Sequence, residues 1–138
     1  VTNYEIWRSF DKKPSFFRSY NQGYKKITIS PAKLRKRFYE PNDYVNSDIS
    51  GCYYFEDNNL DVFMLYEFRQ TTMSYGENYP DEMLNKQEQL RIYPRRRYVK
   101  LPSRIEFWDS EEPKEFRIMF SPYSEWKKFT TMLMKEVS

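Results

Sequence analysis

The residues best suited to binding chemistry form a basic and aromatic segment, RIYPRRRYVKLP, at positions 91–102. The segment has no acidic residue, and its candidate contact residues are Arg91, Tyr93, Arg95, Arg96, Arg97, Tyr98 and Lys100. Three consecutive arginines repel one another, and a proline precedes them, so we expect an extended arm rather than a helix. Such an arm indicates an acidic partner, and the alternative interpretation is a solvated loop.

A second basic group lies in the segment SPAKLRKRF at 30–38, and its candidate contact residues are Lys33, Arg35, Lys36 and Arg37. Lysine and arginine neutralise phosphates, and nearby tyrosine rings stack on unpaired bases, so both segments also suit single-stranded nucleic acid. The simpler interpretation of this group is the solvated face of a helix, opposite Leu34 and Phe38.

Catalytic chemistry is poorly represented in the sequence. There is no histidine, a single cysteine and three isolated glycines, which removes the commonest general base, zinc sites built on paired cysteines and phosphate-binding glycine loops. We interpret the carboxylates of 56–61 and 109–112 as solvated turns and Cys52 as a small buried apolar residue. We therefore expect no enzyme activity, no catalytic residue, no metal and no small-molecule cofactor.

Charge is unevenly distributed along the chain. The net charge is only +3, but residues 1–39 and 91–138 are basic whereas residues 40–90 are acidic. This arrangement favours docking on an acidic protein, or self-assembly of the basic ends of one copy on the acidic segment of another. With no signal-like segment and no apolar run long enough to span a membrane, we expect an intracellular protein, cytoplasmic or virion-associated.

Two strand-to-helix junctions give the clearest structural pattern. Ile27 and Ile29 alternate before Ser30-Pro31, a favoured N-cap followed by a favoured first helical residue. The segment FRIMFSPYSEWKKF repeats the pattern, so we expect a strand at 116–120 and a helix opened by Ser121-Pro122. The inner stripe of that second helix would comprise Trp126, Phe129, Thr130, Leu133 and Val137.

Two hairpins are expected between and beside these junctions. The first joins 51–57 to 60–70 through a tight primed turn at Asn58-Asn59, and its second strand, apolar on both faces, is expected to be central. The second hairpin would join RIEFW (104–108) to EFRIMF (115–120). The segment from 71 to 103 is read as an insertion that carries the basic strip, and residues 1–24 as an aromatic and basic arm that includes a strand.

These elements predict a single α+β domain over residues 1–138, with an antiparallel sheet of about five strands and two helices on one face. The order is strand, helix, hairpin, insertion, hairpin, helix. A pleckstrin-homology-like barrel with a C-terminal helix is the alternative. Aromatic residues form 20% of the chain, which is enough ring surface for a core.

The segments RFYEP and DVFMLYEFR resemble motifs of a group of small α+β proteins from phages and large DNA viruses. That group has Phe-Gly-Glu-Pro, followed by a strand similar to Phe-Thr-Ile-Tyr-Asp-Tyr-Lys. Phe38, Glu40 and Pro41 match the first motif, whereas Tyr39 replaces its glycine. The resemblance implies the fold and a viral setting, and it implies no activity.

The function that these observations favour is a non-enzymatic interaction or assembly module of viral origin. It would dock acidic partners through its basic and aromatic segments, helped by exposed aromatics such as Trp7, Phe10, Phe16 and Phe17. The alternative is a single-stranded nucleic-acid-binding protein that uses the same segments.

Overall fold

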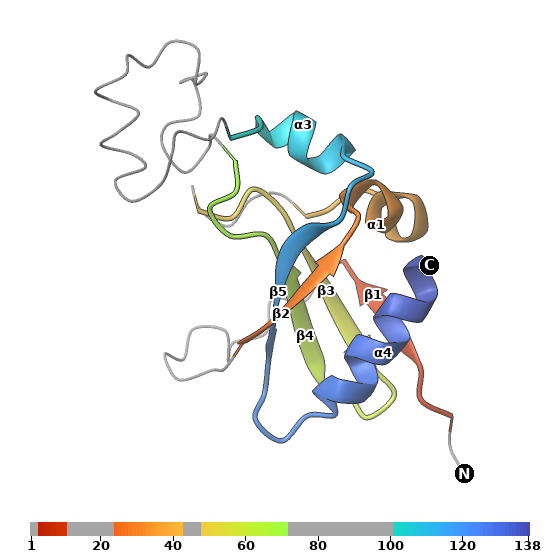
Figure 1. The fold of residues 1–138 in the computed structure, drawn as a ribbon. Helices are drawn as coiled ribbons and strands as arrows, with labels where there is room; N and C mark the ends of the chain where they lie inside the picture. The colour runs from red at the N-terminus through yellow and green to blue at the C-terminus, as the bar shows by residue number, and fades with distance from the viewer. Residues whose placement is uncertain (1–2, 11–23, 43–47, 72–100) are drawn as a thin grey trace.

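The computed structural model describes residues 3–10, 24–42, 48–71 and 101–138, and these form an α+β fold (Figure 1). In chain order the elements are β1 (Ile6–Ser9), β2 (Tyr24–Ile29), α1 (Pro31–Phe38), β3 (Cys52–Asp57), β4 (Val62–Tyr66), α3 (Arg104–Asp109), β5 (Lys114–Phe120) and α4 (Trp126–Val137). The strands form one antiparallel sheet in the order β1-β3-β4-β5-β2. Within the described residues this sheet is open, so the predicted α+β class is confirmed and the barrel alternative is wrong.

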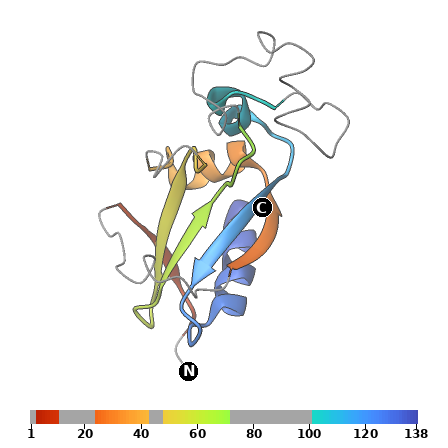
Figure 2. The ribbon, with the colours of Figure 1, turned by 90° about the vertical axis from the view of Figure 1, so that its left-hand side faces the viewer.

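The helices pack on one face of the sheet, with α1 and α3 together near one end and α4 lying across the strands (Figures 1 and 2). Their apolar faces meet alternate residues of the strands in one core. Phe129 of α4 is fully buried and stacks on Phe63 of β4, with ring centroids 4.1 Å apart. Inward-facing side chains of four strands complete this core, among them Ile29, Tyr53, Phe55, Leu65, Phe116, Ile118 and Phe120.

The opposite face of the sheet is also buried around its central strand. Met64 and Tyr66 of β4 form a second cluster with Cys52 and Tyr54 of β3. This agrees with the expectation that a strand apolar on both faces is central, since β4 is the middle strand of the five. Cys52 is buried, as predicted, and it forms no disulfide within the described residues.

The β2–α1 junction forms as the sequence predicts. The Ser30 hydroxyl accepts a hydrogen bond from the Lys33 backbone N–H at 3.3 Å, and Pro31 is the first helical residue. This bond satisfies one of the backbone donors left unpaired at a helix start, and the proline has no such donor to satisfy. Leu34 and Phe38 then face the core.

The predicted second hairpin is wrong, because residues 104–109 form the helix α3 and not a strand. Ser103 and Glu106 make a capping box: the Glu106 N–H donates to the Ser103 hydroxyl at 3.2 Å, and the Ser103 N–H donates to the Glu106 carboxylate at 3.4 Å. Strand β5 pairs instead with β4 and β2. The Ser-x-x-Glu spacing was visible in the sequence and outweighs the apolar alternation of Ile105 and Phe107.

The start predicted for the last helix is also wrong, because α4 begins at Trp126. Ser121 begins a turn, in which both the N–H and the hydroxyl of Ser124 donate to the Ser121 carbonyl, at 3.0 and 2.7 Å. The predicted inner stripe is confirmed in part: Phe129, Leu133 and Val137 are buried, whereas Trp126 and Thr130 are half-buried.

The first hairpin exists, but its turn differs from the prediction. Asp57 and Asp61 flank a three-residue loop in which Leu60, with φ of 66°, takes the left-handed conformation that we expected at the asparagines. The Asp57 carboxylate accepts from the N–H groups of Asn59 and Asp61 at 3.0 and 2.9 Å. Asp57 is fully buried and Glu56 is buried as well, so the interpretation of these two carboxylates as part of a solvated turn is wrong.

Tyr39, the residue after α1, adopts φ of 68° and ψ of −165°, a region that is almost restricted to glycine. Its side chain is 73% exposed and contributes little packing. We expect Tyr39→Gly to raise the free energy of unfolding by about 1 kcal/mol, because relief of about 1–3 kcal/mol of strain exceeds the extra entropy of glycine in the unfolded chain.

Chemical denaturation of the purified protein measures this effect. Tyr39→Ala is the matched control, because alanine removes the same side chain and keeps the strain. A gain in stability with alanine equal to that with glycine would contradict the explanation.

Candidate anion-docking surface

The first predicted site cannot be placed, because Arg91, Tyr93, Arg95, Arg96, Arg97, Tyr98 and Lys100 all lie outside the described residues. The same holds for residues 72–100 of the predicted insertion and for 11–23 of the predicted N-terminal arm. The candidate site is therefore built from the basic residues of the sheet and its helices.

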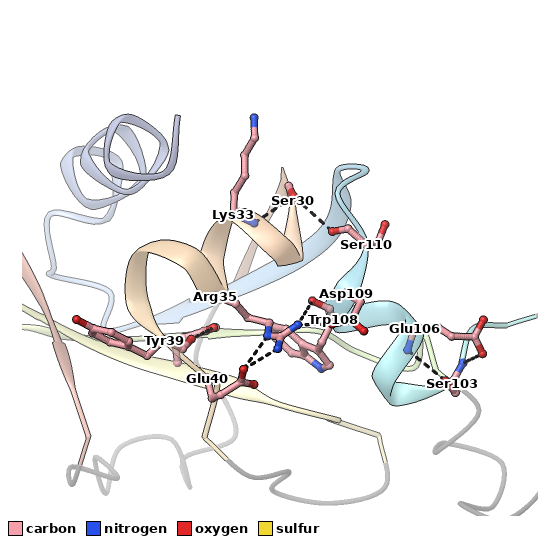
Figure 3. Close-up of polar contacts among 11 residues, drawn as sticks. Ser30, Lys33, Arg35, Tyr39, Glu40, Ser103, Glu106, Trp108, Asp109 and Ser110 are labelled. Atoms are coloured by element: carbon pink, nitrogen blue, oxygen red, sulfur yellow. Dashed lines mark hydrogen bonds and ion pairs between the residues drawn. The ribbon is translucent and has the colours of Figure 1, made fainter.

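Arg35 of the predicted α1 group is engaged within the protein (Figure 3). Its guanidinium donates to the Glu40 carboxylate at 2.6 Å, to the Trp108 carbonyl at 3.2 Å and to Asp109. Hydrogen bonding to Glu40, and then to Asp109, raises the pKa of Arg35, partly offset by burial. This residue joins α1 to the end of α3, so its role is structural.

The other members of the α1 group are one arginine that pairs with a carboxylate and two exposed lysines. The Arg37 Nε donates to the Glu136 carboxylate of α4 at 2.8 Å, which joins these two helices. Lys33 and Lys36 are exposed, and neither has a carboxylate partner in the part of the chain that the structure describes. Figure 3 shows the Lys33 side chain extending away from the Arg35 cluster. The predicted four-residue group therefore supplies two ammonium groups that lack a carboxylate partner within the described ranges.

The other arginines within the described ranges also contact groups of the same chain. Arg8 donates to the Phe38 carbonyl and to Asn42 Oδ1, and its guanidinium lies 4.7 Å from the centre of the Tyr53 ring. Burial lowers the pKa of Arg8. Three further arginines contact a carboxylate, a carbonyl or two aromatic rings of the same chain: Arg69 with Asp48, Arg104 with Ser50, and Arg117 with Tyr24 and Phe68. Arginines thus hold segments of this fold together.

Lysines gather instead on a hollow beside α4. The hollow has a volume of about 380 Å³ and is lined by Tyr4, Lys127, Lys128, Thr131, Met132 and Lys135. Lys135 has no carboxylate partner among the described residues, Lys127 lies 5.5 Å from the Trp126 ring centre, and Lys128 Nζ is 3.9 Å from Glu125. We call this hollow the lysine groove.

Tyr4 forms the wall of the lysine groove opposite the helix. Its hydroxyl donates to Asp57 Oδ2 at 3.0 Å, which ties the segment before β1 to the hairpin loop. Burial, and then the hydrogen bond to Asp57, raises the pKa of Tyr4. The phenol therefore stays protonated and fixed, and it presents ring surface beside the ammonium groups.

The lysine groove was not predicted, although the spacing of its lysines is visible in the sequence. Residues 127, 131 and 135 are spaced by four and lie on one face of a helix, and 128 and 132 lie beside them. The stripe runs opposite Phe129 and Leu133, so it corresponds to the solvated side of an amphipathic helix. What the periodicity does not show is the approach of Tyr4, which converts a helix face into a groove.

The lysine groove has donors and apolar surface, which suit carboxylates or phosphates. In the described part of the chain, no group of cysteine, aspartate or glutamate residues has the arrangement of a metal site. The predicted exposed aromatics are accessible where they are described: Trp7 is 41% and Phe10 57% exposed, whereas Phe16 and Phe17 lie outside the described residues.

Comparison with known proteins adds no relative. No protein-family model matches this chain, and no curated protein matches its sequence. None of the described helices has the length and apolar character required to cross a membrane.

Proposed function

We propose that this protein is a binding module rather than an enzyme, and that it docks an acidic protein segment in the lysine groove of α4. The observation that supports this most strongly is the difference between its arginines and the lysines of the groove. The described arginines contact groups of the same chain, whereas Lys127 and Lys135 face the groove and have no carboxylate partner among the residues that the structure describes. Charges without internal partners on a concave surface favour association with an oppositely charged ligand.

The borders of the lysine groove favour a short acidic protein segment over a nucleic acid. Glu125 lies at the start of α4, and Glu5 and Glu136 line an adjoining hollow of about 650 Å³ that shares Tyr4 and Lys135 with the groove. A long phosphate backbone would have to pass these carboxylates, and like charges repel. A short segment with a few carboxylates fits between them.

The alternative of single-stranded nucleic-acid binding depends on the segment 91–102 and stays a prediction from sequence, as do the viral setting and the intracellular location. Self-assembly through the acidic residues 40–90 also stays a prediction.

The test is fluorescence anisotropy with a labelled tetraglutamate peptide and a labelled single-stranded oligonucleotide of equal charge, across a salt series. We expect the wild type to prefer the peptide. Lys127→Glu with Lys135→Glu should weaken peptide binding about 5- to 30-fold, which corresponds to about 1–2 kcal/mol for two reversed charges.

Lys33→Glu with Lys36→Glu on α1 is the matched control, because it makes the same change in net charge on another helix. We expect this variant to stay within about 3-fold of the wild type, since those lysines lie outside the groove. Equal weakening by both variants, or no binding of the peptide at low salt, would overturn the proposal. Tighter binding of the oligonucleotide would favour the nucleic-acid alternative instead.

A further inference from the structure

Within the described residues, strand β2 forms one edge of the sheet, because its one partner there is β5. It is six residues long and strongly exposed: Tyr24 is 45% exposed, and Lys25, Lys26 and Thr28 are also classed as exposed. An antiparallel edge strand directs half of its backbone N–H and C=O groups away from its neighbour. For β2 these outward groups have no backbone partner in the described part of the chain.

The edge at β2 is also basic. Lys25 and Lys26 lie on β2, with Lys114 and Arg117 on the neighbouring β5. Among the described residues, the carboxylate that pairs with this edge is Glu115, which lies 3.8 Å from Lys26 Nζ in an exposed ion pair. Exposed pairs of this kind contribute little to stability, so an incoming carboxylate competes with Glu115 readily.

The edge continues toward the lysine groove through one aromatic ring. Lys25 Nζ of β2 lies 5.0 Å from the Trp126 ring centre, and Lys127 Nζ of α4 lies 5.5 Å from the same centre. Trp126 therefore connects the basic edge of the sheet with the first lysine of the groove. A ligand bound along β2 on the helix side of the sheet would meet both cations.

A second copy of the chain is a poor partner for this edge. Pairing β2 with β2 would bring together two edges that each carry lysines, and like charges on adjoining strands are destabilising. Lysines on an exposed edge are a common protection against such self-pairing. The same lysines attract a strand that carries carboxylates.

We propose that β2 accepts an extended acidic peptide by strand addition, with main-chain hydrogen bonds along the free edge and carboxylates beside Lys25 and Lys26. This inference rests on the acidic partner of the proposed function and assigns it a binding mode. Main-chain bonds give affinity in this mode, and the alternating side chains give specificity.

Hydrogen–deuterium exchange with a threonine-rich peptide that carries two successive glutamates tests the proposal, because successive side chains of a strand point to opposite faces, as those of Lys25 and Lys26 do. We expect the outward amides of Tyr24–Ile29 to exchange at least tenfold more slowly when the peptide is saturating. The matched control is the same peptide with its central residues N-methylated, which keeps the charge and removes the main-chain donors. We expect the methylated peptide to bind at least tenfold more weakly and to leave β2 unprotected.

The outcomes separate this inference from the proposed function. Equal affinity of the two peptides, or a bound peptide without protection of β2, would overturn strand addition. If peptide binding in either case still weakened in the variant Lys127→Glu with Lys135→Glu, the proposed docking in the lysine groove would stand without strand addition. Protection of β2 that rises with protein concentration in the absence of peptide would show self-pairing and would also overturn the inference.

Discussion

Replacing Trp108 with alanine is expected to lower the free energy of unfolding by about 3–5 kcal/mol, the range for a large aromatic removed from a core. The Trp108 side chain is 5% exposed, and its ring packs against Tyr53, Phe107 and Phe116 with centroids 5.5–6.1 Å away. Its Nε1 also donates to the Ser50 hydroxyl at 3.0 Å. Removal of the indole opens a cavity and leaves a buried hydroxyl without its donor.

Gly51 shows how closely Trp108 is packed. A Cβ atom added at Gly51 would lie 2.8 Å from the indole ring, so glycine is required for this approach. Trp108 thus fixes α3 on the loop that leads into β3, and its loss is expected to release both.

Urea denaturation measures the effect of Trp108→Ala, with two variants as controls. Trp108→Phe keeps most of the apolar contact and loses the indole N–H, and we expect a smaller loss of about 1–2 kcal/mol. Ile105→Ala changes a residue of the same helix that is 75% exposed, and we expect a change within about 0.5 kcal/mol. Equal effects of Trp108→Ala and Ile105→Ala would contradict the docking of α3.

The second large effect is expected at Glu67, which is fully buried. Its carboxylate accepts from the backbone N–H of Ser50 at 2.5 Å and of Gln70 at 3.1 Å, so it joins the turns before β3 and after β4. Glu67→Ala leaves two N–H donors without their acceptor, and we expect a loss of about 2–3 kcal/mol at neutral pH. Glu67→Gln keeps an acceptor and the volume, so its loss should be about 1 kcal/mol.

Glu67 also gives the folding stability a pH dependence of defined sign. Burial raises the pKa of Glu67 in the folded protein, partly offset by the hydrogen bonds from Ser50 and Gln70. Between its ordinary pKa and this raised pKa, the folded state binds more protons than the unfolded state. The contribution of Glu67 therefore grows as pH falls through the raised pKa and is complete below the ordinary one.

The measurement is the difference in free energy of unfolding between the wild type and Glu67→Gln, from pH 8 to pH 4. Other carboxylates titrate alike in both proteins and cancel in the difference. We expect the difference to shift in favour of the wild type as pH falls. A shift in favour of Glu67→Gln would mean that hydrogen bonding outweighs burial and that the pKa of Glu67 is lowered.

The sequence by itself determined the features that depend on local chemistry. Ser30-Pro31 defined the start of α1, the apolar run on both faces of β4 defined the central strand, and the spacing of Phe129, Leu133 and Val137 defined the buried side of α4. Each of these depends on residues a few positions apart, so the information lies within one segment of the chain.

Tertiary structure decided what depends on distant partners. The position of α3 on the sheet depends on Trp108, which donates to Ser50, 58 positions away. Arg37 became a structural residue because Glu136, 99 positions away, packs beside it. Composition shows how many cations the chain has, but only the packing of helices on the sheet decides which are neutralised and which face a ligand.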